Sequence, residues 1–126
     1  MPIQKLDHVN LRTARLDRMI TWYAEVLQLR PGARPDFPFA GAWLYAGDVA
    51  VVHLVETEDK DAVGGEAALK LEHFAFSATD LAGFEARLER LQVDYKRSDS
   101  RITGLVAFNI WDPDGNHIHV DFTPGV

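Results

Sequence analysis

A repeat of one short strand-like segment constrains the fold of this chain more than any other feature. Residues 6–11 read Leu-Asp-His-Val-Asn-Leu, and residues 71–76 read Leu-Glu-His-Phe-Ala-Phe. The two histidines, His8 and His73, are 65 positions apart, and an acidic residue precedes each of them. A duplicated unit predicts two similar modules related by a pseudo-twofold axis, with the repeated side chains meeting between the halves.

Hydrophobic periodicity gives each half a similar order of elements. Apolar residues recur at spacings of three and four from Leu16 to Leu27, which is typical of one helical face. A second stripe runs from Leu81 to Leu91, after the capping pair Thr79-Asp80. The predicted strands are 4–12, 42–45, 49–55, 71–77, 94–96, 105–111 and 117–123. We interpret each half as a βαβββ module.

The length of the chain favours one domain. A unit of about 60 residues buries little apolar surface, so two independent domains would not fit into 126 residues. We therefore expect a single α+β domain over residues 1–126, in which the two modules form a shared, curved eight-stranded sheet around a cleft. Module one should cover about 1–57 and module two about 70–126. A polar linker at about 58–69 should join them.

Composition excludes some classes of partner. The net charge of -6 and the lack of a basic tract argue against nucleic acid and anionic membranes. No apolar run approaches the roughly 20 residues that span a bilayer. Cysteine is absent, which excludes disulfides and thiolate metal sites. The N-terminal residues lack the apolar core of a secretion signal, so a cytoplasmic location is the default expectation.

The histidines fall on one kind of strand face. In the strands predicted at 4–12, 71–77 and 117–123 they alternate with apolar residues, which should pack under a helix while the histidines line the cleft. Four histidines can then face one cavity: His8, His53, His73 and His119. His117 has the same parity, but it follows the turn at 112–116 directly, and we expect it to be solvated.

Imidazole nitrogens bind Zn, Mn, Fe and Ni at neutral pH, and three of them with open water positions make a workable catalytic site. We predict a divalent metal ion bound by His8, His73 and His119. A strand histidine can also be a hydrogen-bonded filler, and the chain has no local motif such as His-Glu-x-x-His to decide between the two.

At this point the chain resembles the vicinal oxygen chelate superfamily, also called glyoxalase/bleomycin-resistance/dioxygenase proteins. The resemblance rests on residues 6–11, 71–76 and 108–119, the last of which contains the turn Asp-Pro-Asp-Gly. It implies eight strands from two modules around a metal cleft, usually in a homodimer. It also implies a small-molecule substrate that chelates the ion through two adjacent oxygens.

Two positions depart from the pattern that the resemblance implies. Many members have a Glu ligand four residues after the turn glycine, where this chain has His119. Others carry a carboxylate on the last strand of the first module, here 49–55. Aligning Gly47 with Gly115 puts that position at Val51, which cannot coordinate an ion or accept a proton. His53 could then serve as the base, and Arg12 is the candidate cation for an anionic substrate.

These departures leave several functions open. A three-ligand site resembles the fosfomycin-resistance transferases, although no cluster of basic residues is present to hold glutathione or a phosphonate. An extradiol dioxygenase would need Asp121 as its carboxylate ligand. We favour a metal-dependent lyase, isomerase or transferase. The alternative is a metal-free protein of the bleomycin-resistance type that sequesters a small molecule.

Pocket walls can be proposed from strand parity. Trp43 and Tyr45 share one face of their strand, and Phe108 and Ile110 share one face of theirs. If these residues face the cleft, the ligand has an apolar or aromatic part. Simple core packing is the alternative for all four.

Overall fold

The computed structural model describes residues 2–58 and 70–123. The chain divides into two compact units, residues 1–62 and 63–126. The predicted linker lies outside the described residues from position 59 to position 69. Within the described part of the chain, no helix is long and apolar enough to span a membrane.

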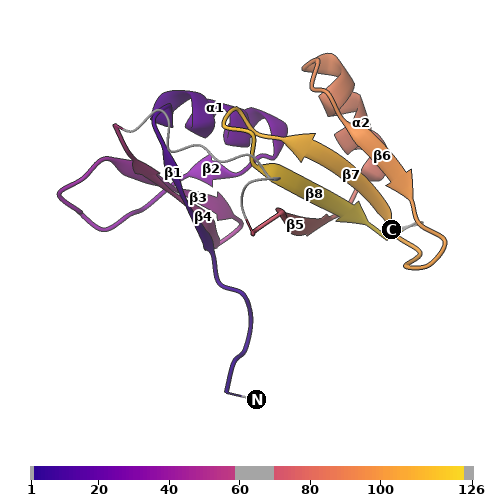
Figure 1. The fold of residues 1–126 in the computed structure, drawn as a ribbon, viewed down its shortest axis with the longest axis horizontal. Coiled ribbons are helices and arrows are strands. Elements are labelled where there is room, and N and C mark those ends of the chain that lie inside the picture. The colour runs from indigo at the N-terminus through magenta and orange to yellow at the C-terminus, as the bar shows by residue number, and fades with distance from the viewer. Residues whose placement is uncertain (1, 59–69, 124–126) are drawn as a thin grey trace. The chain divides into compact units, whose positions relative to one another are not determined.

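Within residues 2–58, the first unit contains one helix and four strands (Figure 1). In chain order they are β1 (Val9–Thr13), α1 (Leu16–Val26), β2 (Arg30–Pro31), β3 (Gly41–Ala46) and β4 (Val49–Glu56). The strand order in the sheet is β1-β4-β3-β2, with β1 parallel to β4 and the other pairs antiparallel. The two-residue strand β2 is the one element of this unit missing from the predicted strands.

Helix α1 forms where the apolar stripe predicts it. Met19, Tyr23 and Val26 are its buried residues, and they follow the expected spacing of three and four. Before the helix, the Thr13 hydroxyl accepts a hydrogen bond from the Arg15 amide at 2.9 Å. After it, Gln28 takes a positive φ of 56° and turns the chain back toward the sheet.

The second unit repeats this topology. Its elements are β5 (His73–Ala78), α2 (Leu81–Arg90), β6 (Lys96–Asp99), β7 (Val106–Trp111) and β8 (His117–Phe122). The sheet order is β5-β8-β7-β6, and β5 is parallel to β8 as β1 is to β4. Asp80 caps α2 from a left-handed conformation (φ 67°), and its carboxylate accepts a hydrogen bond from the Gly83 amide at 3.1 Å. The predicted α+β fold with two similar modules is confirmed.

The shared eight-stranded sheet needs correction. Every strand pairing among the described residues joins strands of the same unit, which gives two four-stranded sheets. The physical reason is that the first strand of each module completes its own sheet, by pairing in parallel with the last strand. Strand β1 is also shorter than predicted, because pairing with β4 begins only at Val9 and residues 4–8 are exposed.

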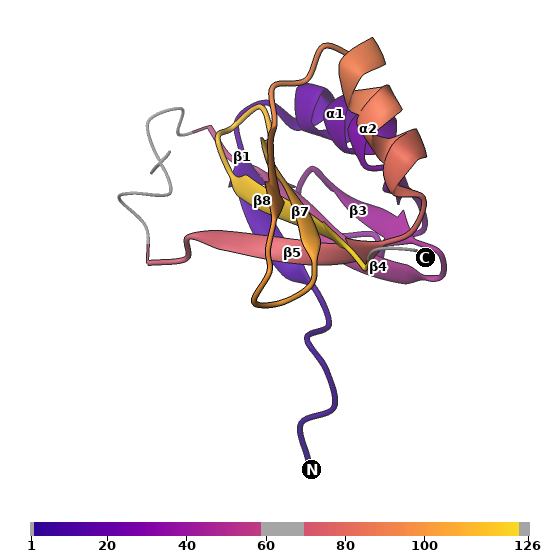
Figure 2. The same ribbon diagram turned by 90° about the vertical axis from the view of Figure 1, so that its right-hand side faces the viewer.

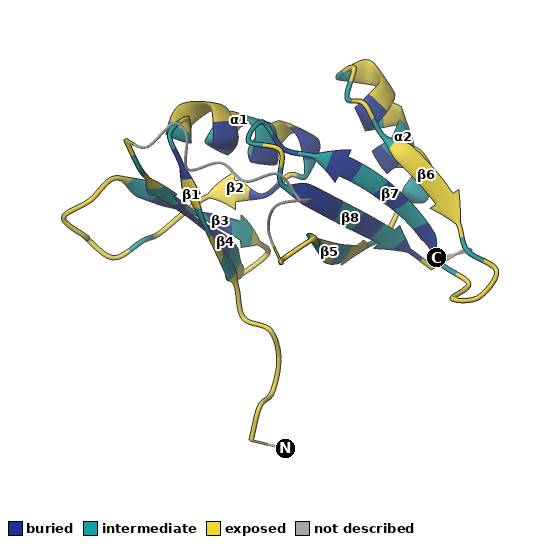
Figure 3. Ribbon diagram, viewed as in Figure 1, coloured by how far each residue is buried: buried dark blue, intermediate teal, exposed yellow. Residues whose placement is uncertain are grey.

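The core of the second unit lies between α2 and its sheet (Figures 2 and 3). Phe108 of β7 is fully buried, with its ring centroid 5.4 Å from that of Phe84 on α2 and 5.7 Å from that of Phe122 on β8. Ile110, two residues on, is also fully buried. The pocket-wall interpretation of Phe108 is therefore wrong, because its face of β7 packs under α2 and the opposite face carries Asn109 and Trp111.

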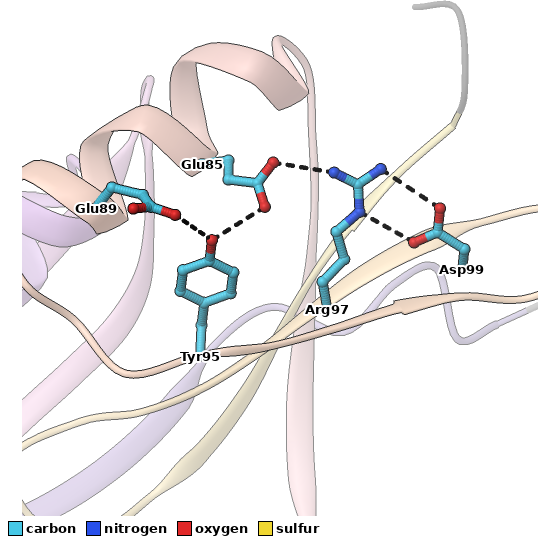
Figure 4. Close-up of polar contacts among 5 residues, drawn as sticks. All are labelled: Glu85, Glu89, Tyr95, Arg97 and Asp99. Atoms are coloured by element: carbon cyan, nitrogen blue, oxygen red, sulfur yellow. Dashed lines mark hydrogen bonds and ion pairs between the residues drawn. The ribbon is translucent and has the colours of Figure 1, made fainter.

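A polar network ties the exposed edge strand β6 to α2 (Figure 4). The Tyr95 hydroxyl lies 2.8 Å from a carboxylate oxygen of Glu89 and 3.1 Å from one of Glu85. Arg97 donates to Glu85 and to Asp99, both at 3.0 Å. The hydrogen bond to Glu89 is the main cause that raises the pKa of Tyr95 to about 12. These contacts join β6 and the residue before it to α2.

Candidate metal centre

Each repeated histidine is hydrogen-bonded to the acidic residue before it. His8 Nδ1 lies 2.7 Å from Asp7 Oδ2, and His73 Nδ1 lies 2.9 Å from Glu72 Oε1. An ionised carboxylate only accepts hydrogen bonds, so both rings donate from Nδ1, and in the neutral ring Nε2 keeps its lone pair. These hydrogen bonds are the main cause that lowers the pKa of Asp7 and of Glu72. Carboxylates support metal-binding histidines in this way.

Three histidines of the second unit form a cluster. His73, His117 and His119 each offer a ring nitrogen, and these atoms lie within 4.8 Å of one another. The rings of His73 and His119 are stacked at a centroid distance of 3.8 Å, and the centroids of His117 and His119 are 4.8 Å apart. Burial lowers the pKa of His119, and the nearby charges of His73 and then His117 lower it further. His119 is therefore held in the neutral form that binds metal ions.

The expectation that His117 is solvated is wrong. Its relative exposure is 8%, its ring stacks on Trp111 at 4.8 Å, and its Nε2 lies 3.0 Å from Asn109 Oδ1. The physical reason is that β8 begins at this residue, with His73 of β5 on one side and Trp111 of β7 on the other. The sequence did show that His117 has the same strand parity as His119. We expected solvation because His117 directly follows the turn at 112–116.

In the first unit, His53 lies between two other rings. It stacks on His8 at 3.8 Å and on Trp43 at 4.1 Å, and its exposure is 8%. Its Nε2 is 3.1 Å from the Ala50 carbonyl oxygen, an acceptor, so Nε2 donates and Nδ1 carries the lone pair. Burial is the main cause that lowers the pKa of His53, and the charge of His8 contributes next. A neutral His53 can accept a proton at Nδ1.

The strand register shows which first-unit residue corresponds to His119. His119 pairs with Ala75, two residues after the repeated histidine of the second unit. In the first unit, the residue two positions after the repeated histidine is Asn10, and its partner is His53. His53, rather than Val51, is therefore the counterpart of His119.

The correction to Val51 has a local cause. Aligning Gly47 with Gly115 assumes that the two hairpins have equal turns, but residues 47–48 connect β3 and β4, whereas residues 112–116 connect β7 and β8. A register shift between Leu44 and Tyr45 displaces the first hairpin further. This register shift could not be predicted from the sequence alone.

The remaining predicted residues are not members of the cluster formed by His73, His117 and His119. Arg12 is exposed on β1, where it pairs with Val55. Trp43 packs on His53 and is partly exposed, while the Tyr45 hydroxyl contacts the Ala33 carbonyl. Asp121 follows His119 on the same strand face, and its Oδ1 is buried without a hydrogen-bond partner among the described residues.

Two βαβββ units that each carry a carboxylate-supported histidine next to a second, buried histidine define a class of duplicated α+β proteins with a candidate metal site. The sequence profile of the Glyoxalase/Bleomycin resistance protein/Dioxygenase superfamily matches residues 5–120. The chain belongs to this superfamily.

Solved structures have the same fold. A glyoxylase/bleomycin resistance protein/dioxygenase domain from Frankia sp. EAN1pec superposes with a TM-score of 0.80 at 20% identity, over 98% of this chain and 94% of that one. A lactoylglutathione lyase from Agrobacterium tumefaciens gives 0.72 at 22% identity, over 96% and 95%. A genomically encoded fosfomycin resistance protein from Listeria monocytogenes gives 0.74 at 13% identity, over 95% and 93%. No curated protein sequence matches the chain.

Proposed function

We propose that this chain is a metal-dependent lyase, isomerase or transferase that binds one divalent ion, Zn, Mn, Fe or Ni, through His8, His73 and His119. The observation that carries the proposal is the pair of hydrogen bonds that His8 and His73 donate from Nδ1 to Asp7 and Glu72, which leave Nε2 of each repeated histidine with its lone pair. A histidine that only fills space in the sheet has no need of a carboxylate partner that recurs in both units.

The donor set fits a divalent transition metal. Imidazole nitrogens suit Zn, Fe and Ni better than Mg or Ca, which prefer oxygen. His119 in place of a Glu leaves the ion with more of its positive charge. When bound, such an ion polarises the oxygens of a chelating substrate and stabilises negative charge that develops on them.

We assign two further roles to this chain's own side chains. His53 holds a lone pair at Nδ1, because Nε2 is committed to the Ala50 carbonyl, and its lowered pKa keeps it available as a general base. Arg12 is an exposed guanidinium on the strand that follows His8, and we propose that it contacts an anionic group of the substrate.

The relatives named above include a lyase and a fosfomycin resistance protein, and at this level of identity they support the fold rather than a reaction. A small-molecule ligand, a homodimer and a cytoplasmic location remain part of the proposal. The metal-free, bleomycin-resistance type of binding protein is the alternative outcome of the test below.

The test is the metal content of protein purified without a nickel column or chelator, measured by elemental analysis. We expect about one ion of a single divalent metal per chain, by the stoichiometry of a single site. His8→Ala and His73→Ala should each reduce this value, while Lys96→Gln on an exposed strand should not. No bound metal, even after incubation with Mn, Fe, Ni and Zn, would refute the metal-dependent proposal and favour the binding-protein alternative, which ligand-binding screens would then test.

A further inference from the structure

We propose that His117 is an additional ligand of the ion, that it binds through Nδ1, and that Asn109 is the residue that positions it. The inference rests on the proposed function, since it adds a ligand to the same ion. The residues that carry it all belong to the second unit, on β5, β6, β7 and β8 and at Glu72 just before β5.

The orientation of the Asn109 amide follows from its two contacts. Its Nδ2 donates to the Lys96 carbonyl oxygen at 3.2 Å, and a carbonyl oxygen can only accept. The amide oxygen of Asn109 must therefore be the atom that faces His117 Nε2 at 3.0 Å. Both contacts agree only if His117 Nε2 carries a proton and donates it. In a neutral ring the lone pair is then on Nδ1.

Two further contacts hold the ring in place. The indole of Trp111 lies parallel to the His117 ring, with an interplanar angle of 11°. On the neighbouring strand β5, the ring of His73 lies with its centroid 5.4 Å from that of His117. A ring that is buried, stacked and hydrogen-bonded loses little additional freedom when it binds an ion.

The charge around Nδ1 favours a cation. Glu72 Oε1 is 3.9 Å from His117 Nδ1, which is beyond hydrogen-bond distance, and its hydrogen bond goes to His73. The carboxylate is thus close enough to attract a cation bound at His117 Nδ1. One ring nitrogen from each of the three histidines lies within 4.8 Å of the others. His73 and His117 then bind from opposite ring nitrogens, because Glu72 supports one ring and Asn109 supports the other.

The direct test is long-range proton–nitrogen correlation NMR of the metal-free protein, followed by titration with Zn²⁺. Before zinc, His117 should show a protonated Nε2 and an unprotonated Nδ1, and His73 the reverse. At saturation, the resonances of His117 Nδ1 and His73 Nε2 should both shift. A His117 ring protonated at both nitrogens, or an Nδ1 signal that zinc leaves unchanged, would overturn the inference.

Variants give a second readout through the dissociation constant for Zn²⁺. His117→Gln keeps an amide N–H that can reach Asn109 and removes the ring nitrogen, and we expect it to weaken binding by at least about tenfold. Asn109→Leu should weaken binding by about tenfold, and Asn109→Asp, which still accepts from Nε2, should restore most of the loss. Lys96→Gln keeps the carbonyl that Asn109 contacts and is the matched control with unchanged affinity.

The two proposals fail in different ways. If His73→Ala loses zinc while His117→Gln binds it as tightly as the unmodified protein, the inference about His117 is wrong and the proposed metal site stands. If the unmodified protein binds none of the metals, both are wrong. Circular dichroism of each variant confirms that a change in affinity is not a failure to fold.

Discussion

Replacing Glu72 by alanine tests whether the acidic residue of the repeat supports the histidine that follows it. In the structure Glu72 Oε1 accepts a hydrogen bond from His73 Nδ1 at 2.9 Å, which fixes the proton on Nδ1 and the lone pair on Nε2. Without the carboxylate, the neutral ring is free to move its proton to Nε2, where it blocks metal binding. The variant should therefore bind Zn²⁺ more weakly and fold normally.

The magnitude follows from exposure. Loss of such a supporting partner costs 10–100-fold in metal affinity, and the side chains of His73 and Glu72 are 36% and 67% exposed, so water partly replaces the carboxylate. We expect the low end, about tenfold. Glu72→Gln keeps an acceptor oxygen without the charge, so its Zn²⁺ affinity should lie between those of the unmodified protein and Glu72→Ala.

The assay is competition for Zn²⁺ against a chelating dye, with the melting temperature measured on the same samples. Asp7→Ala is the matched variant in the first unit, since Asp7 supports His8 at 2.7 Å in the same way. A dissociation constant for Glu72→Ala within about twofold of the unmodified protein would refute the reasoning, because it would mean that the carboxylate does not set the state of the ring.

Three further predictions concern stability and titration. Phe108→Ala should lower the free energy of unfolding by about 3–5 kcal/mol, because the ring is fully buried under α2; urea denaturation measures this, and a loss below about 1 kcal/mol would contradict the assigned core. For metal-free protein, the free energy of unfolding should fall as pH drops below about 6.5, because the pKa of His53 is lower in the folded than in the unfolded chain and unfolding there takes up a proton. His53→Gln should flatten this pH dependence, and an unchanged slope would show that His53 is not held neutral. The tyrosinate absorbance of Tyr95 should develop only near pH 12, so Tyr95→Phe should remove the titration step near that pH, and its persistence in the variant would assign it to another tyrosine.

The order of elements could be predicted because local patterns control it. The helical stripe that contains Met19 and Tyr23 and the capping residue Asp80 act within a few positions of the chain, and the helices form where these patterns occur. The short strand β2 and the late start of β1 could not be predicted, because both depend on the strand that pairs with them.

The candidate site was predictable in part. The parity of the last strand put His117 and His119 on one face, but the burial of His117 comes from neighbouring strands that only the sheet brings together. The role of Asn109 had no sequence signal, since its importance comes from two hydrogen bonds to residues on the neighbouring strands β6 and β8. Likewise, His53 replaced Val51 as the counterpart of His119 only when the register was known.

The sequence by itself determined the duplication, the α+β class and the strand faces that carry histidines, because repetition and alternation are properties of the chain. Only the tertiary structure decided the strand pairing, the register and the protonated nitrogen of each ring. A hydrogen bond such as that from His117 to Asn109 forms only when β8 lies beside β7 in the right register. The packing of the whole sheet sets that order and register.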